Sequence, residues 1–294
     1  MFAYKVFKMD DSQVFTTVSS LRKQLDWRAK DSKVGFVPTM GALHHGHISL
    51  VKQALKACDL VVVSIFVNPT QFSNSEDLIK YPRTLQKDVD LLNTAGDILI
   101  FAPGIEDVYP PNFENISVDL GDLGTVMEGQ FRPGHFNGVM NVVKRLFDIV
   151  EPQLAFFGLK DFQQVAVIKH MVNELKLPVK IVECDIIREA SGLASSSRNV
   201  RLSEEQKVEA LALIHTLHLV KALVLTYSPK KARKIAFKEF KKSGMKLEYL
   251  EIVHPYTLQS LSKKWVPGAN ACIAAYCGEV RLIDNLQLVT IEEK

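Results

Sequence analysis

The chain has 294 residues, of which 47% are hydrophobic and 23% are charged, and its formal net charge at pH 7 is +3. This composition is typical of an ordinary globular protein, and it excludes collagen-like, low-complexity and disordered chains. The longest apolar runs, Leu60–Val63 and Ile65–Val67, are far shorter than the roughly 20 residues that span a bilayer, so we expect no membrane partner.

Strand and helix patterns alternate through the first 185 residues. The opening segment, MFAYKVFKMDD, lacks the long apolar run of a secretory signal, which predicts a cytoplasmic protein. The alternation predicts an α/β protein with a parallel sheet, helices on both faces, and ligands beyond the carboxyl ends of the strands. The expected strands are 34–38, 60–67, 98–101, 154–157 and 179–183. The expected helices are 49–57, 84–94, 139–150 and 162–175, the last preceded by a capping-box-like start at Asp161 and Gln164.

The pattern changes after about residue 186. Ser203 and Gln206 form a capping box for a helix that we expect to reach Tyr227, and a lysine-rich helix follows. Strand-like runs at 247–253, 271–276 and 280–283 complete the chain. Helices followed by antiparallel-looking strands predict a second, smaller α+β domain. The expected domains are residues 1–187 and 188–294.

Positive charge is concentrated in residues 230–246, which hold eight basic residues and one acid. The rest of the chain is net negative, unlike a diffusely basic nucleic-acid binder, so we expect no nucleic-acid partner. We interpret the segment as an amphipathic helix with a solvated lysine face, and an anionic partner is the alternative. The four cysteines are too scattered for a disulfide framework and are expected to be small buried thiols.

The most informative stretch, Met40–His47, joins an expected strand to an expected helix and contains the pattern HxGH at His44, Gly46 and His47. Glycine lets the backbone approach a phosphate closely, and a helix N-terminus offers free N–H donors. Two imidazoles there can stabilise negative charge on a leaving phosphate. Histidine also binds metals, but no Cys, Asp or Glu lies nearby in the sequence to complete a ligand set.

Polar residues follow two other expected strands. Asn68 and Gln71 come after the strand 60–67, where amides suit a polar substrate, although ordinary turn residues are the alternative. Lys160 and Asp161 begin the helix after the strand 154–157. Lys160 is suited to a polyphosphate, and Asp161 either caps the helix or holds a ribose hydroxyl.

A serine cluster, Ser195 to Ser197, ends at Arg198. Its hydroxyl groups and the fork of guanidinium donors suit a phosphate ligand. A flexible interdomain linker is the alternative for this stretch taken alone. Because three other stretches also point to a phosphate or substrate site, we interpret it as part of that site.

These four stretches, in this order and spacing, resemble the pantothenate synthetase (pantoate–β-alanine ligase) family of HxGH nucleotidyltransferases. The similarity continues through Tyr81–Leu85, Arg132–Phe136 and Arg281–Asn285, so it covers essentially the whole chain. It implies a Rossmann-like doubly wound domain with a smaller C-terminal lid, usually in a homodimer. It also implies an enzyme of coenzyme A biosynthesis that uses ATP and Mg²⁺ to join (R)-pantoate to β-alanine through a pantoyl adenylate.

Carried over by motif, the resemblance gives His47 the role of a proton donor and places His44, Lys160 and Arg198 on the ATP phosphates. Gln71 and Gln164 would bind pantoate, Gln71 also β-alanine, and Asn68 is placed beside them by its position. Ser195 stands where the family usually has Met or Leu, which puts the local packing in doubt. The implied ATP contacts are Met40, Gly41, Ala42, Leu43, His44, His45, Gly46, His47, Gly158, Leu159, Lys160, Asp161, Ile187, Ser195, Ser196, Ser197 and Arg198.

Two alternatives stay open. Another HxGH adenylyl- or cytidylyltransferase would share nucleotide binding without activating pantoate. A nucleotide sensor would bind without catalysis. The presence of both histidines and of Lys160 favours an enzyme.

Overall fold

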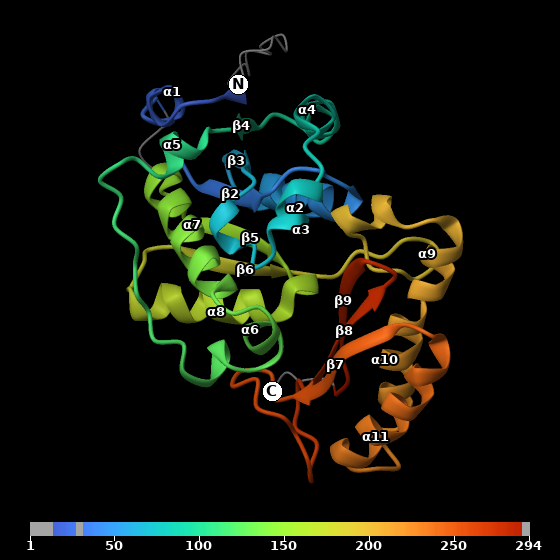
Figure 1. Cartoon of the computed structure of the whole chain (residues 1–294). Coiled ribbons are helices and arrows are strands. Elements are labelled where there is room, and N and C mark those ends of the chain that lie inside the picture. Colours follow the sequence, from blue (N-terminus) through green and yellow to red (C-terminus); the bar gives the residue numbers. More distant parts are fainter. Residues whose placement is uncertain (1–13, 28–31, 290–294) are drawn as a thin grey trace, which may run out of the picture.

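The computed structural model describes residues 14–27 and 32–289 and contains two sheets, one of six strands and one of three (Figure 1). The N-terminal segment that carries the prediction about secretion lies outside the described residues. Within the described part of the chain, no helix is long and apolar enough to cross a membrane.

The first sheet is parallel throughout, as predicted, with the strand order β1-β4-β3-β2-β5-β6. From β2 the chain adds β3 and β4 on one side, then returns to add β5 and β6 on the other. The neighbours β2 and β5 therefore flank the point where the winding direction reverses, which is where such sheets bind ligands. The strands are β1 (Val14–Phe15), β2 (Val34–Thr39), β3 (Leu60–Ile65), β4 (Leu99–Phe101), β5 (Leu154–Gly158) and β6 (Lys180–Cys184).

Helices cover both faces of this sheet, because successive side chains of a strand point to opposite faces. Phe36 and Phe157 belong to the core beneath α1, α7 and α8, whereas their neighbours Val37 and Phe156 belong to the core beneath α2 and α4. These helices are α1 (Val18–Leu25), α2 (His45–Ala57), α4 (Leu85–Asn93), α7 (His135–Val150) and α8 (Phe162–Glu174).

Several helix boundaries differ from the expected ones. Helices α2 and α7 each begin four residues early, at His45 and His135, so motif residues form their first turns. Asp161 makes no side-chain capping bond to α8, so the predicted capping box is wrong there; its carboxylate pairs with Lys160 instead. The helix expected to reach Tyr227 is split into α9 (Glu204–Ala210) and α10 (Ala212–Ala222), although its capping box is confirmed.

Short elements that the periodicity did not predict connect the larger ones. They are the α-helices α3 (Ser75–Lys80), α5 (Ile105–Val108) and α6 (Met127–Phe131), and the 3-10 helices η2 (Pro69–Gln71), η3 (Gly121–Gly124), η4 (Leu159–Asp161), η5 (Ser197–Arg201) and η6 (Lys241–Ser243).

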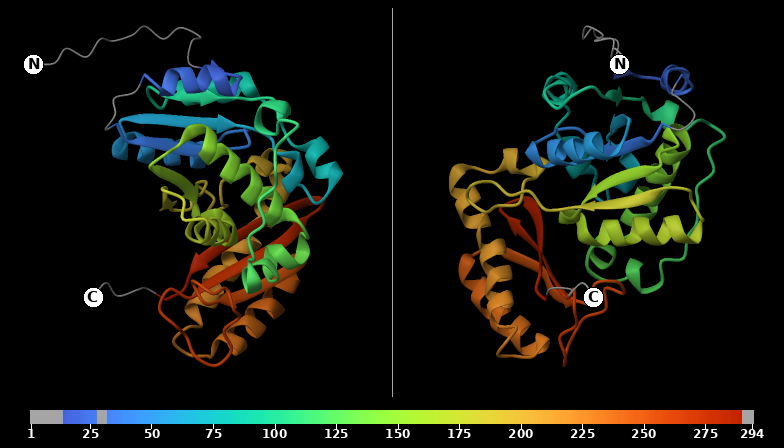
Figure 2. Two further views of the ribbon diagram at one scale, coloured as in Figure 1. Left: turned by 90° about the vertical axis from the view of Figure 1, so that its left-hand side faces the viewer. Right: turned by 180° about the vertical axis from the view of Figure 1, so that it is seen from behind.

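The second sheet is antiparallel and comprises β7 (Lys246–Val253), β8 (Asn270–Cys277) and β9 (Val280–Gln287). One face packs on α10 and on α11 (Pro229–Phe240). The other face carries Tyr249, which joins a core with Met127 of α6 and Phe162 of α8. The C-terminal sheet thus lies directly against α6 and α8 (Figure 2).

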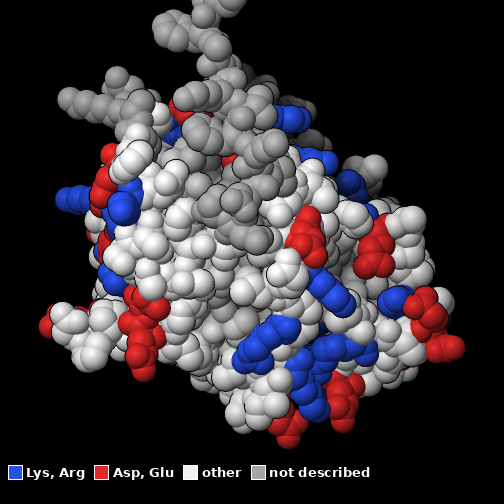
Figure 3. Space-filling view, turned by 90° about the horizontal axis from the view of Figure 1, so that it is seen from above, with Lys and Arg blue, Asp and Glu red and all other residues white. Residues whose placement is uncertain are grey.

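Helix α11 is amphipathic, as the sequence predicted, with Ala232, Ala236 and Phe240 buried and its lysines outside. Figure 3 shows the opposite end of the molecule, from above α1 and α4, where basic side chains lie beside acidic ones. All four cysteines are free thiols, three of them buried and Cys58 partly so.

Candidate active site

The loop between β2 and α2 carries the HxGH pattern. Gly41 and Ala42 take positive φ angles of 77° and 49°, which only glycine adopts freely. The buried carboxylate of Asp88 stabilises this turn, because it accepts the N–H of Ala42 at 3.0 Å and that of Leu43 at 2.8 Å. Helix α4, distant in sequence, therefore fixes the backbone of the loop.

His44 and His47 cap α2 with their own rings. Nδ1 of His44 accepts the Gly46 N–H at 3.1 Å, and Nδ1 of His47 accepts the His44 N–H at 3.2 Å. A ring nitrogen that accepts carries no proton, so each neutral ring is protonated at Nε2. Position 46 must be glycine for this arrangement, because a Cβ there would lie 2.8 Å from the His44 ring.

Both rings are neutral at physiological pH. Burial and then the charge of Lys160 lower the pKa of His44 to about 4. Burial, with His44 and Lys160 adding to it, lowers the pKa of His47 well below its ordinary value. A neutral imidazole with a proton on Nε2 is a hydrogen-bond donor. The HxGH loop therefore contributes two uncharged donors.

Beyond β3, η2 positions two amides. Asn68 is buried and saturated, since Nδ2 donates to the Gly138 carbonyl at 3.1 Å and to Oε1 of Gln71 at 3.2 Å while its oxygen accepts within the same turn. Nε2 of Gln71 lies 2.8 Å from Sδ of Met40. Asn68 thus holds the turn, and the Gln71 amide is presented at the end of the strand.

Beyond β5, η4 presents Lys160, whose Nζ lies 3.4 Å from the Asp161 carboxylate. Asn285 of β9 donates to the carbonyls of Leu159 at 2.8 Å and Lys160 at 3.0 Å, so the C-terminal sheet fixes this turn. Gln164 lies in the first turn of α8, and its amide has no protein hydrogen-bond partner among the described residues. Lys160 and Gln164 are therefore available to a ligand.

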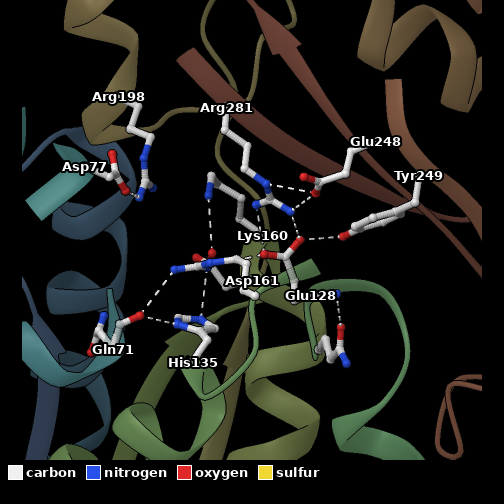
Figure 4. Close-up of polar contacts among 12 residues, drawn as sticks. Gln71, Asp77, Glu128, His135, Lys160, Asp161, Arg198, Glu248, Tyr249 and Arg281 are labelled. Carbon is white, nitrogen blue, oxygen red and sulfur yellow. Dashed lines mark hydrogen bonds and ion pairs between the residues drawn. The ribbon is translucent and has the colours of Figure 1, made fainter. Parts of the chain in front are cut away.

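The serine cluster is an ordered part of the site and not a free linker. Ser197 donates to the Ala42 carbonyl at 2.8 Å, which joins η5 to the HxGH loop. Arg198 and Arg201 share the carboxylate of Asp77 in α3 at 2.7 and 3.1 Å (Figure 4 shows the Arg198 pair). Burial alone would raise the pKa of Asp77, but Arg198 and Arg201 lower it below its ordinary value.

Ser195, where the sequence departs from the family pattern, keeps a backbone contact. Its N–H donates to the Ile187 carbonyl at 2.9 Å. Its side chain is buried beside Gly46, with Cβ 3.7 Å from where a Cβ on that glycine would lie. The backbone N–H that makes this contact is present with any side chain at position 195 other than proline.

These elements enclose a cavity of about 210 Å³ at the carboxyl ends of β2, β3, β5 and β6. Its apolar wall comes from α7, through Val139, Val142, Val143 and Leu146. Five of the predicted site residues do not line it: Gly41, Ala42, Leu43, His45 and Leu159. Those that do are Met40, His44, Gly46, His47, Asn68, Gln71, Gly158, Lys160, Asp161, Gln164, Ile187, Ser195, Ser196, Ser197 and Arg198.

Sequence reasoning missed Asp88 as the residue that supports the HxGH loop. A signal was present, because Asp88 interrupts the apolar spacing of Leu85 and Leu92 on α4. A charge that is buried at such a position needs a hydrogen-bonding or charged partner. His135 was noted only within a resembling stretch, yet it contacts the backbone of Gln71 at 2.7 Å.

Known proteins resemble this chain over almost its whole length. The model of a family described as pantoate-beta-alanine ligase matches residues 13–287. The chain is 47% identical to a pantothenate synthetase of Porphyromonas gingivalis, over 94% of this chain and 99% of that one. It is 46% identical to one of Bacteroides thetaiotaomicron, over 94% of this chain and 98% of that one.

Solved structures give the same result. The crystal structure of pantothenate synthetase from Thermus thermophilus superposes with a TM-score of 0.87 at 43% identity, covering 94% of this chain and 99% of that chain. The pantoate-beta-alanine ligase of Francisella tularensis, complexed with beta-gamma ATP and beta-alanine, has a TM-score of 0.75 at 35% identity and covers 93% and 97%.

Proposed function

The chain belongs to the pantoate-beta-alanine ligase family, and we propose that it joins (R)-pantoate to β-alanine, using ATP and giving pantothenate, AMP and pyrophosphate. One observation supports the site: a single cavity holds the rings of His44 and His47, the Lys160 ammonium, and the amides of Gln71 and Gln164. Donors and a cation suit the phosphates of ATP, and the amides suit the hydroxyl and carboxylate groups of pantoate.

The proposed chemistry has two steps, because a carboxylate is a poor acyl donor whose leaving group would be oxide. A carboxylate oxygen of pantoate attacks the α-phosphorus of ATP, the bond to pyrophosphate breaks, and pantoyl adenylate forms. The amine of β-alanine then attacks the acyl carbon, loses a proton, and AMP leaves. No enzyme nucleophile is needed, so the protein's contribution is alignment and charge stabilisation.

On the nucleotide side, His44 and His47 donate from Nε2 to phosphate oxygens, and Lys160 and Arg198 supply positive charge. Because burial keeps His47 neutral, we assign it hydrogen-bond donation in place of the proton donation that the sequence resemblance implies. The proposed ATP contacts are the residues that line the cavity: Met40, His44, Gly46, His47, Gly158, Lys160, Asp161, Ile187 and Ser195–Arg198. Gly41, Ala42, Leu43, His45 and Leu159 do not line it, and we assign them the shape of their loops in place of direct contact.

On the substrate side, Gln71 and Gln164 contact the polar groups of pantoate, and Gln71 also contacts β-alanine. Pantoate carries two methyl groups on one carbon. The apolar wall of α7, with Val139, Val142 and Val143, offers those methyl groups a surface that excludes water. Asn68 supports Gln71 from behind and need not contact the substrate.

Four further features belong to the same proposal. Mg²⁺ accompanies the ATP phosphates. In residues 14–27 and 32–289, no group of three or more His, Cys, Asp or Glu side chains could hold a metal ion. We also propose that residues 188–294 act as a lid on the domain of residues 1–187, that the protein is a homodimer, and that it works in the cytoplasm.

The first experiment measures AMP production from ATP with pantoate and β-alanine supplied singly and together. We expect AMP only when both are present, or in a single slow turnover with pantoate alone. AMP production that needs neither substrate would contradict the proposal. An inactive protein that still binds ATP would favour a nucleotide sensor.

The second experiment tests the adenylate. Labelled pyrophosphate should exchange into ATP when pantoate and Mg²⁺ are present and β-alanine is absent. Omitting pantoate should abolish the exchange. Exchange that requires β-alanine would favour a concerted route, and exchange with 4′-phosphopantetheine in place of pantoate would favour an adenylyltransferase.

A further inference from the structure

Buried polar contacts connect strand β9 of the C-terminal sheet to the first sheet's layer (Figure 4). Arg281 forms ion pairs with Glu248 of β7 and with both oxygens of Glu128, the latter at 2.9 and 2.7 Å. Tyr249 donates to the same Glu128 carboxylate at 2.7 Å. Burial alone would raise the pKa of Glu128, but Arg281, Arg132 and Tyr249 lower it to about 2. This carboxylate therefore stays ionised.

The contacts continue through Arg132 and His135 to Gln71. Nη1 of Arg132 lies 3.3 Å from the Glu128 carboxylate and 3.1 Å from Nε2 of His135. Nδ1 of His135 lies 2.7 Å from the carbonyl oxygen of Gln71. A carbonyl only accepts and a guanidinium only donates, so the His135 proton is on Nδ1 and its Nε2 accepts from Arg132.

The backbone of η2 is held closely against α7 around this contact. Nη2 of Arg132 also approaches the Gln71 carbonyl oxygen, at 3.5 Å. A Cβ on Gly138 would lie 2.4 Å from the Thr70 carbonyl oxygen, so the two backbones meet without intervening side chains. The direction of the Gln71 amide depends on this backbone. His135 does not line the cavity of about 210 Å³. It acts on the Gln71 amide through the backbone carbonyl of that residue.

We propose that His135 is a positioning residue for pantoate and that Arg281 controls its tautomer and place through Glu128 and Arg132. The inference rests on the proposed function, because it takes Gln71 as the pantoate contact. Arg281 belongs to the C-terminal sheet, whereas Gln71 follows a strand of the first sheet. The proposed contacts therefore link the affinity for pantoate to the position of the C-terminal sheet. His135 contacts Gln71 and none of the residues proposed to bind ATP, so its effect should fall on pantoate, and on β-alanine through the same amide, and not on ATP.

Three variants of His135 test the role. His135→Ala should raise the KM for pantoate roughly 10- to 100-fold, as expected for a lost buried hydrogen bond, with a much smaller change in the KM for ATP. His135→Asn keeps a donor near the Nδ1 position and should restore most of the affinity. His135→Gln places its amide near the Nε2 position and should not. If His135→Ala fails to fold, the Asn and Gln variants carry the comparison.

Equal KM values for pantoate in the Asn and Gln variants, or equal losses for pantoate and ATP, would overturn the proposal. Gln71→Ala separates it from the proposed function. If Gln71→Ala leaves the KM for pantoate unchanged, the substrate assignment itself fails. If Gln71→Ala weakens pantoate binding and no His135 variant does, only the present inference fails.

The distal end is tested with Arg281→Lys, which keeps the charge but loses the forked contact with Glu128. We expect a smaller rise in the KM for pantoate, roughly 3- to 10-fold, with the KM for ATP little changed. The control is Arg233→Lys, because Arg233 pairs with Glu251 at 3.0 Å elsewhere in the C-terminal layer. A KM for pantoate that is the same in both variants would exclude control from β9.

Discussion

The carboxylate of Asp88 lies 2.8 Å from the backbone nitrogen of Leu43, so helix α4 determines the path of the loop that presents the two HxGH histidines. Asp88→Ala leaves the Ala42 and Leu43 N–H groups without their acceptor. We expect it to lower the free energy of unfolding by about 1–3 kcal/mol and to raise the KM for ATP. Urea unfolding and steady-state kinetics measure the two effects.

Asp90→Ala is the matched control, because Asp90 lies on the same helix, away from the loop, and its side chain bonds to Gln86 at 2.9 Å. It should stay close to the unmodified protein in both measurements. If the two variants behaved alike, Asp88 would not support the loop.

The HxGH pattern contains its own control for catalysis. His47→Ala removes an Nε2–H donor at the cavity, and we expect kcat to fall roughly 100- to 1000-fold, the usual effect of losing one such donor. His45 is exposed and does not line the cavity, so His45→Ala should keep near-normal kcat. Thermal unfolding should show both variants folded. A normal adenylation rate in His47→Ala would show that its ring does not act on the phosphates.

The fold was largely predictable because hydrophobic periodicity reports burial directly. The five predicted parallel strands and the antiparallel C-terminal strands are all present. The two-residue strand β1 is too short for a pattern to register. The starts of α2 and α7 were set too late because their first turns are stabilised by tertiary and ring contacts, as at His44 and His135, and not by apolar spacing.

The candidate site was predictable where chemistry is concentrated in a short motif. His44, Lys160 and Gln164 lie around one cavity as expected. The supporting contacts were not predictable, because each joins residues far apart in the chain, as Arg281 does with Glu128 across 153 positions. The sequence also could not show that the carboxylate of Asp161 pairs with Lys160.

Stability should depend on pH through the three histidines whose pKa is lowered in the folded protein, His44, His47 and His135. Burial and then a neighbouring cation, Lys160 or Arg132, lower the pKa of His44 and of His135 to about 4, from 6.5. Between these values the unfolded chain binds protons that the folded chain excludes, so the free energy of unfolding should fall as pH drops from about 6.5 to about 4. Urea midpoints from pH 7.5 to 4.5 measure this. His135→Asn does not titrate there and should reduce the slope; an unchanged slope would contradict the assignment.

Two adjacent glutamines of α8, Gln163 and Gln164, lie in different environments. Gln163 is buried; its oxygen accepts the Glu128 N–H at 2.9 Å, and its Nε2 donates to the carbonyls of Leu123 and Val126 at 2.7 and 2.9 Å. Gln164 lines the cavity. Gln163→Ala leaves the Glu128 N–H and the Leu123 carbonyl without this partner, whereas the Val126 carbonyl keeps the Gly129 N–H at 2.9 Å. The variant should lower the free energy of unfolding by about 1–3 kcal/mol.

Gln164→Ala removes no protein hydrogen bond to the described residues, so its urea midpoint should stay near that of the unmodified protein. Its KM for pantoate should rise more than that of Gln163→Ala, and more than its own KM for ATP, because its amide is free to contact the substrate. We therefore expect Gln163→Ala to lose stability and Gln164→Ala to lose affinity for pantoate. The opposite pairing would mean that Gln164 is a structural residue, and it would remove one of the two amides from the proposed pantoate site.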